Sequence, residues 1–182
     1  MDDDQNTGLD YSKIEVNELF QPIKKLFEFY ILGIGFVGMP SFQSVFLGVH
    51  PSFRPLIESY NATVHLRESD GKVYSETGPY WILIGRIMAI AIFDVLQFSE
   101  YQKMLRNNSL FKFAKYIRNG AAHNNKFTFD NKQKMDLPIS WSNKTLTAAS
   151  EGASVFPDFI SAPDLITLMH DISEVIKVES KK

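Results

Sequence analysis

The feature that most constrains the fold is an apolar run at residues 80–98, near the middle of the chain. The run is apolar on almost every side, and a helix of this kind is buried among other elements. Pro79 precedes it and suits the first turn of a helix. Arg86 and Asp94 interrupt the run and need polar partners if they are buried. We therefore expect a central buried helix, with both charges reaching the surface or bridging to a neighbouring helix.

Helical patterns also lie near both ends of the chain. Residues 12–30 carry apolar side chains at helical spacing, namely Ile14, Leu19, Ile23, Leu26, Phe27 and Tyr30. Towards the other end, Ser161 is a typical N-cap, Pro163 suits a first turn and Asp164 favours a helix N-terminus. The apolar stripe that follows is Leu165, Leu168, Met169, Ile172, Val175 and Ile176. His170 lies off this stripe, and we expect it to be solvated.

Short strand patterns are confined to two regions. Residues 137–141 and 145–148 could pair around a turn at Ser142-Asn143-Lys144, and residues 61–78 read as a long loop or a short hairpin. The sequence therefore predicts one domain, residues 1–182. Its fold class is all-α, a helical bundle with a small β-hairpin appendage between the helix near residues 110–121 and the C-terminal helix.

Residues 29–49 form a run of 21 residues without a charge. That length could span a membrane, which would make the chain a small helical membrane protein. Four glycines and Pro40 interrupt the run, however, so two buried helical pieces joined at Pro40-Ser41 explain the same residues. We favour the buried pieces and expect no membrane partner.

The composition excludes several kinds of chemistry. The chain has no cysteine, so disulfides, thiolate metal sites and a cysteine nucleophile are ruled out. Its four scattered histidines lack the spacing of a metal site, and no glycine-rich phosphate loop is present. The acidic N-terminus has no signal-peptide pattern. We expect a cytoplasmic protein that uses no metal and no cofactor.

A second amphipathic helix is predicted just after the central one. Its apolar stripe is Leu110, Phe113, Ala114, Ile117 and Ala121. On an ideal helix Arg118 lies ~100° and His123 ~240° from Ile117, so both avoid the stripe. They flank a polar face that also holds Asn119. Residues suited to helix ends border the run, with Ser109 as N-cap and Asn124 and Asn125 as stop residues.

The same helix lies in a basic part of the chain. Residues 103–134 contain eight basic residues and one acid, Asp130, whereas the whole chain has a net charge of −2. A basic block of this kind is typical of a surface that binds a polyanion. We therefore expect Lys112, Lys115 and Lys126 to bind nucleic acid.

Arg118, Asn119 and His123 form an R-N-x-x-x-H pattern that resembles the signature of the HEPN superfamily, helical domains found in prokaryotic toxins and RNases. The resemblance implies a metal-independent endoribonuclease whose substrate partner is RNA. It implies that His123 is the general acid/base and that Arg118 binds the scissile phosphate. Asn119 would orient the substrate or a catalytic side chain. An imidazole titrates near ~6.5 and serves in both forms.

The resemblance also implies a homodimer with the motif helices at its interface, and an antitoxin as a further partner. Arg118 and His123 lie ~140° apart on an ideal helix, which suits a site shared between two chains. An alternative remains open at this point. The chain could be a catalytically silent HEPN-like module that binds RNA, a nucleotide or a protein through the same residues.

Overall fold

The computed structural model describes residues 13–37, 40–49, 52, 54, 66–69, 72–75 and 78–181. Its helices longer than one turn are α1 (Gln21–Val37), α2 (Pro40–Val49), α4 (Gly78–Phe98), α6 (Ser109–Ala122), α7 (Asn131–Asp136) and α8 (Ala162–Glu179). Short helical turns occur at η2 (Glu18–Phe20), α5 (Gln102–Leu105) and η4 (Ala148–Ser150). The strands form two antiparallel hairpins, β1 (Leu66–Ser69) with β2 (Lys72–Ser75), and β3 (Ile139–Trp141) with β4 (Lys144–Leu146). The expected all-α fold with a small hairpin before the last helix is confirmed.

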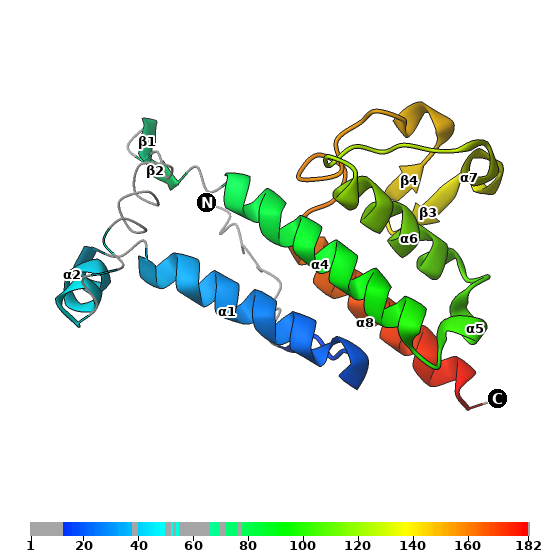
Figure 1. Ribbon diagram of the computed structural model, residues 1–182, viewed down its shortest axis with the longest axis horizontal. Coiled ribbons are helices and arrows are strands. Elements are labelled where there is room, and N and C mark those ends of the chain that lie inside the picture. The colour runs from blue at the N-terminus through cyan, green and yellow to red at the C-terminus, as the bar shows by residue number, and fades with distance from the viewer. Residues whose placement is uncertain are drawn as a thin grey trace, which may run out of the picture.

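Helix α4 is central, as its apolar sequence predicts. It packs against α1, α6 and α8 (Figure 1), and Met88, Ile92 and Leu96 are fully buried. A Cβ at Gly85 would lie 2.7 Å from Cδ1 of Phe156. The absence of a side chain at this position therefore lets the ring of Phe156 lie against the helix.

One stripe of α4 is not buried, which corrects the expectation of a helix covered on all sides. Leu83 and Ile87 are exposed, and Phe98 is 84% exposed. The two charges behave as expected for bridges to a neighbouring helix. Arg86 Nε donates a hydrogen bond to the carbonyl oxygen of Ala121 at 2.7 Å, and Asp94 pairs with Arg118.

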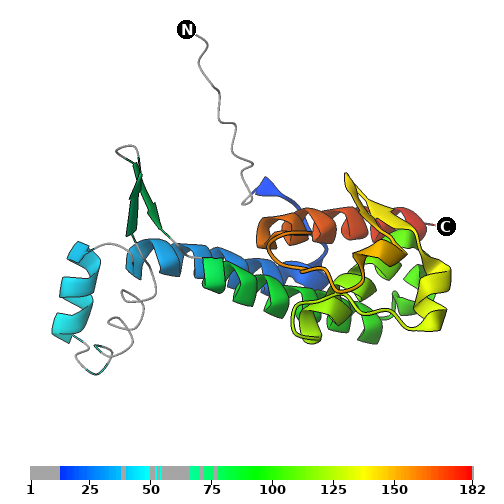
Figure 2. The ribbon, with the colours of Figure 1, turned by 90° about the horizontal axis from the view of Figure 1, so that it is seen from above.

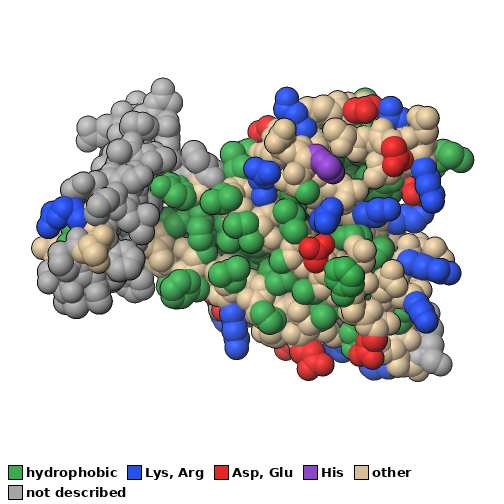
Figure 3. Space-filling view, in the orientation of Figure 1, with side chains coloured by type: hydrophobic (Ala, Val, Ile, Leu, Met, Phe, Trp, Pro, Cys, Tyr) green, Lys and Arg blue, Asp and Glu red, His purple; other side chains and the backbone are tan. Residues whose placement is uncertain are grey.

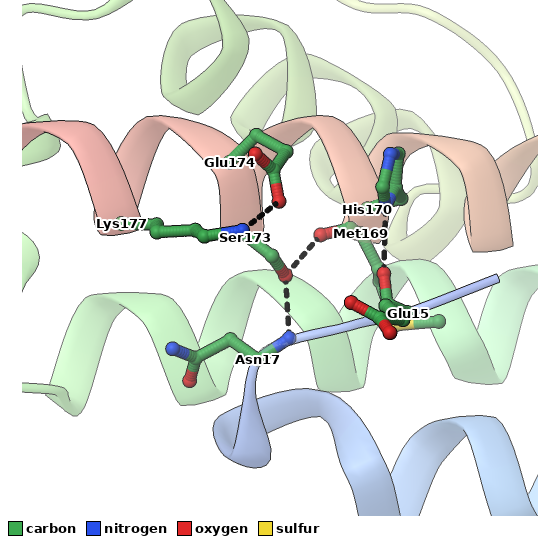
Figure 4. A network of polar contacts seen from close by, with 7 residues as sticks. All are labelled: Glu15, Asn17, Met169, His170, Ser173, Glu174 and Lys177. Atoms are coloured by element: carbon green, nitrogen blue, oxygen red, sulfur yellow. Dashed lines mark hydrogen bonds and ion pairs between the residues drawn. The ribbon is translucent and has the colours of Figure 1, made fainter.

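Helix α8 begins where the sequence predicts. Ser161 caps it, and Ser161 and Asp164 form a reciprocal capping box. The predicted stripe is buried, apart from the half-buried Val175. His170 is not simply solvated, because its Nδ1 lies 2.6 Å from the carbonyl oxygen of Glu15 (Figure 4). A carbonyl can only accept, so this contact assigns the proton to Nδ1.

The N-terminal segment is held on α8 by a second contact. Ser173 Oγ donates to the carbonyl oxygen of Met169 at 2.6 Å and accepts from the Asn17 N–H at 2.7 Å. Both contacts appear in Figure 4, where the segment runs beside α8. Lys24 Nζ donates to the Ile14 carbonyl oxygen at 2.7 Å. The polar groups between the segment and α8 are thus satisfied within the fold.

The uncharged run at residues 29–49 is divided between α1 and α2, as expected, but several of its described side chains are exposed. Phe29 is 74% exposed and Val45 is 70% exposed. Figure 2 shows α2 and the β1–β2 hairpin at one end of the molecule, away from α6 and α8. The expectation of two core pieces is therefore wrong for these two side chains.

Among the described residues, one stretch is long and apolar enough to cross a membrane, and it is Tyr80–Phe98 of α4. Of this stretch, 39% is buried. Within the described part of the chain, this stretch packs against α1, α6 and α8.

The segment between α6 and α8 packs on α6. Trp141 of β3 contacts Phe113, with ring centroids 5.4 Å apart, and its Nε1 donates to Asp171 Oδ2 at 2.8 Å. The hairpin lies where the sequence predicts it, and Ser142 in its turn has φ 52°. Helix α7 was not predicted. Its signal is the capping box formed by Asp130 and Gln133.

Candidate functional site

Helix α6 carries the motif, and its two ends are defined by asparagines. Asn108, rather than the predicted Ser109, is the N-cap, and its Oδ1 accepts from the Leu110 N–H at 2.8 Å. The helix ends at Ala122, because Asn124 (φ 53°) and Asn125 (φ 61°) adopt the left-handed conformation. The side-chain amide of Asn125 donates from Nδ2 to the Phe156 carbonyl oxygen at 2.6 Å and accepts at Oδ1 from the Phe156 N–H at 3.0 Å. This interaction fixes the chain that follows β4 against the end of α6.

The inner face of α6 is closely packed. The predicted stripe is buried except for the half-buried Leu110, and Tyr116 and Gly120 are buried beside it. A Cβ at Gly120 would lie 2.5 Å from Cγ2 of Val155. The glycine inside the R-N-x-x-x-H pattern is therefore explained by packing rather than by chemistry.

Arg118 points towards α4. Its Nε lies 3.5 Å from Asp94 Oδ1, and its NH1 contacts Asn119 Oδ1 at 3.5 Å. Nε is buried, and the contact to Asp94 lacks the geometry of a hydrogen bond. The pair is therefore a loose electrostatic contact. It leaves the guanidinium able to form stronger hydrogen bonds with an anion from outside.

His123 follows the last residue of α6 and is its C-cap. Its backbone N–H caps α6 by donating to the Asn119 carbonyl oxygen, while its exposed ring forms no hydrogen bond with any residue that the structure describes. The ring borders a pocket of about 420 Å³, which is also lined by Asn119, Thr128, Phe129, Asp130, Gln133 and Glu151. Arg118 does not line this pocket. One chain thus brings Asn119 and His123 together and leaves Arg118 on the α4 side.

The basic block is partly neutralised by acids that lie elsewhere in the chain. Lys112 Nζ is 2.8 Å from Asp136 Oδ1, and Lys134 Nζ is 2.8 Å from Glu151 Oε2. These contacts hold the pKa of Asp136 and of Glu151 below the usual range, chiefly through the lysine hydrogen bonds. Both carboxylates are therefore ionised at neutral pH. The charge of the segment in isolation overstates the positive potential of the folded surface.

The three predicted nucleic-acid-binding lysines differ in their surroundings. Lys112 forms an ion pair with Asp136. Lys115 and Lys126 are exposed and form no ion pair with a described residue. Figure 3 shows charged side chains gathered over the half of the molecule that holds α5, α6 and α7, with apolar side chains over α1 and α4. Lys115 and Lys126 are the lysines of this set that can contact a phosphate without first losing a partner.

Several residues of the site carried little signal in the sequence. Arg86 and Asp94 stood out only as charges in an apolar run. Glu151 reaches the pocket because residues 125–127 pair with residues 152–155 through backbone hydrogen bonds. No local pattern predicts such a pairing, since it joins two irregular segments.

Among the described residues, no group of three or more histidine or acidic side chains is arranged to hold a metal ion. No family model matches the chain, and no curated protein and no solved structure is significantly similar to it. Any assignment of function therefore depends on the chemistry of the residues around α6.

Proposed function

We propose that the chain is a metal-independent endoribonuclease of HEPN type. The observation that carries the proposal is the exposure of the His123 ring and its position beside a pocket. Its ring lies exposed beside a polar pocket at the end of a well-packed helix and has no described internal hydrogen bond. Arg118, on the same helix, keeps donors that its loose contact with Asp94 does not use. Neither polar group is needed to complete the packing of α6.

The chemistry follows from these groups. His123 takes the proton from a ribose 2′-OH, and the 2′-oxygen attacks the adjacent phosphorus. The P–O2′ bond forms as the P–O5′ bond breaks, and the leaving 5′-oxygen receives a proton from the imidazolium. The products are a 2′,3′-cyclic phosphate and a 5′-hydroxyl. Arg118 stabilises the charge that develops on the phosphoryl oxygens, and Asn119 orients Arg118 or the substrate. The nucleophile belongs to the substrate, so no metal-bound water is needed.

We propose a homodimer as the active form. Arg118 lies outside the pocket that His123 borders, and His123 stands just past the last residue of α6. Residues five apart on an ideal helix lie ~140° from each other. A two-fold pairing of the α4–α6 faces brings each Arg118 towards the His123 of the other chain. Leu83, Ile87 and Phe98 support this arrangement, because they are exposed on the stripe of α4 that also holds Asp94. An exposed apolar stripe of this kind is typical of an interaction surface.

A cleavage assay tests the proposed activity. Purified chain is incubated with RNA in EDTA, and the products are examined for a 2′,3′-cyclic phosphate. We expect Arg118→Ala and His123→Ala each to abolish cleavage, and Arg106→Ala, an exposed arginine on the same basic segment, to retain it. A 2′-deoxy substitution at the cut site should block the reaction. Cleavage that stops in EDTA and returns with magnesium would overturn the mechanism.

A mixing assay tests the shared site. Inactive Arg118→Ala and His123→Ala chains are combined, unfolded and refolded together. With shared sites each mixed dimer keeps one intact site, so activity partly returns. A monomer by light scattering at micromolar concentration contradicts the dimer.

A second function uses the same surface. The contact between Arg118 and Asp94 and the absence of Arg118 from the pocket favour a catalytically silent module that binds RNA, a nucleotide or a protein such as an antitoxin. Binding of RNA without cleavage, unchanged in His123→Ala, would establish this alternative.

A further inference from the structure

The pocket beside His123 has walls that do not suit a phosphate. Apart from His123, its polar side chains are Asn119, Thr128, Asp130, Gln133 and Glu151. Two of them are carboxylates, and no lysine or arginine lines the pocket. At about 420 Å³ it falls within the usual size of small-molecule sites. Its walls favour a flat, neutral, polar group that carries N–H donors.

The wall formed by α7 is held in place before any ligand arrives. Asp130 Oδ1 accepts from the Gln133 N–H at 2.7 Å, and Gln133 Oε1 accepts from the Asp130 N–H at 2.9 Å. The Tyr116 hydroxyl donates to the Gln133 carbonyl oxygen at 2.9 Å and ties α7 to α6. Because Oε1 of Gln133 is occupied, the group that it can offer a ligand is the Nε2 amide, a donor.

Glu151 supplies the second carboxylate of the lining. Its Oε2 lies 2.8 Å from Lys134 Nζ, which holds the pKa of the carboxyl group below its usual range. A carboxylate fixed in this way is an acceptor at neutral pH. The pocket therefore combines two carboxylate acceptors with the Gln133 amide donor, and the side-chain amide of Asn119 also lines it.

We propose that this pocket is a nucleobase subsite that prefers guanine over uracil in the nucleotide next to the scissile phosphate. The proposal rests on the function proposed above, in which the chain binds RNA. Bases of single-stranded RNA are read on their Watson–Crick edges. Guanine presents adjacent N1–H and N2–H₂ donors, which match one carboxylate, and its O6 suits the Gln133 amide. Uracil presents one N–H between two carbonyl oxygens, which a carboxylate repels.

The test measures binding separately from cleavage. Guanosine 3′-monophosphate and uridine 3′-monophosphate are titrated into the intact chain by calorimetry. We expect guanosine 3′-monophosphate to bind at least about tenfold more tightly. Glu151→Gln removes the charge at constant size and should reduce the preference to less than about threefold. Glu174→Gln, an exposed glutamate of α8 paired with Lys177, is the matched control and should keep it.

A second variant keeps the proposal testable if Glu151→Gln fails to fold. Gln133→Glu retains the oxygen that completes the capping box and removes the Nε2 donor, so it should also lower affinity for the guanine nucleotide. Equal affinity for the two nucleotides, or binding of neither, overturns the subsite even if RNA is cleaved. Preferential binding without any RNA cleavage supports the subsite and overturns the endoribonuclease.

Discussion

Helices α6 and α8 both pack an apolar stripe on α4, and both carry a histidine off that stripe, yet their polar groups behave differently. On α8 the polar side chains are used by the fold. His170 and Ser173 hold the N-terminal segment, and Asp171 accepts from Trp141. On α6 the ring of His123 has no hydrogen bond with a described residue, and the side-chain contacts of Arg118 are 3.5 Å long.

The difference separates structural polar groups from available ones. A polar side chain that completes an internal hydrogen bond contributes about 1 kcal/mol to stability, and its loss leaves a partner unsatisfied. An exposed group without such a partner contributes little to the fold. Its presence at the end of α6 therefore needs another explanation, which binding from outside supplies. Stability measurements can test this comparison position by position.

The largest effect is expected on the inner face of α6. Phe113 is fully buried against Trp141 and Phe159, so Phe113→Ala should lower the free energy of unfolding by about 3–5 kcal/mol. Urea denaturation measures the change. Met135→Ala, at an exposed methionine of α7, should stay within about 0.5 kcal/mol. Similar losses for both variants would contradict the assignment of the core.

The glycine of the motif comes next. Gly120→Ala places a Cβ 2.5 Å from Val155 and should cost about 1–3 kcal/mol. Gly33→Ala is the matched control in α1, because nothing lies within 4 Å of its added Cβ. It should stabilise the chain by about 0.5–1 kcal/mol, since alanine favours a helix interior. A neutral Gly120→Ala would show that packing does not explain this glycine.

On α8, Ser173→Ala removes the acceptor of the Asn17 N–H and should lower stability by about 1–2 kcal/mol. Asn119→Ala, on the outer face of α6, should change it by no more than about 0.5 kcal/mol. Chemical denaturation of the two variants compares the helices directly. Equal losses of stability in Ser173→Ala and Asn119→Ala would contradict the proposed difference between α8 and α6.

Tyr116 is a polar group of α6 that does serve the fold. Burial, with Asp136 and Asp130 nearby, raises its pKa from 10.0 to about 12. The folded chain therefore holds this proton more tightly than the unfolded chain, and stability is lost as pH rises from 10 towards about 12. Tyr116→Phe should cost about 1 kcal/mol at neutral pH. The difference in free energy of unfolding between the unmodified chain and Tyr116→Phe should become smaller as pH rises above 10. A difference that stays constant with pH would contradict the raised pKa of Tyr116.

The smallest effect on stability is expected at the proposed catalytic residues. Arg118→Ala and His123→Ala should each change the free energy of unfolding by no more than about 0.5 kcal/mol, while cleavage is lost. His170→Ala is the matched histidine of α8 and should cost more, because it releases the Glu15 carbonyl group. If His123→Ala unfolds the chain, the residue is structural and the comparison fails.

Local signals in the sequence determined much of the helical architecture. The period of apolar residues predicted the inner faces of α6 and α8, because a helix that packs on one side must place its apolar residues there. Ser161 and Asp164 predicted the start of α8, since side-chain caps act within one turn. The spacing of Arg118 and His123 predicted an angle of ~140° between them on an ideal helix, whereas His123 follows the last residue of α6.

The surroundings of those residues were decided by tertiary structure. Exposure of Phe29 and pairing of Arg118 with Asp94 depend on which surfaces meet, and no local period encodes that. Glu151 enters the pocket of His123 through pairing between two irregular segments far apart in the chain. Electrostatic contacts depend on distance in space rather than along the chain. A run of positive charges in the sequence is therefore partly neutralised on the folded surface.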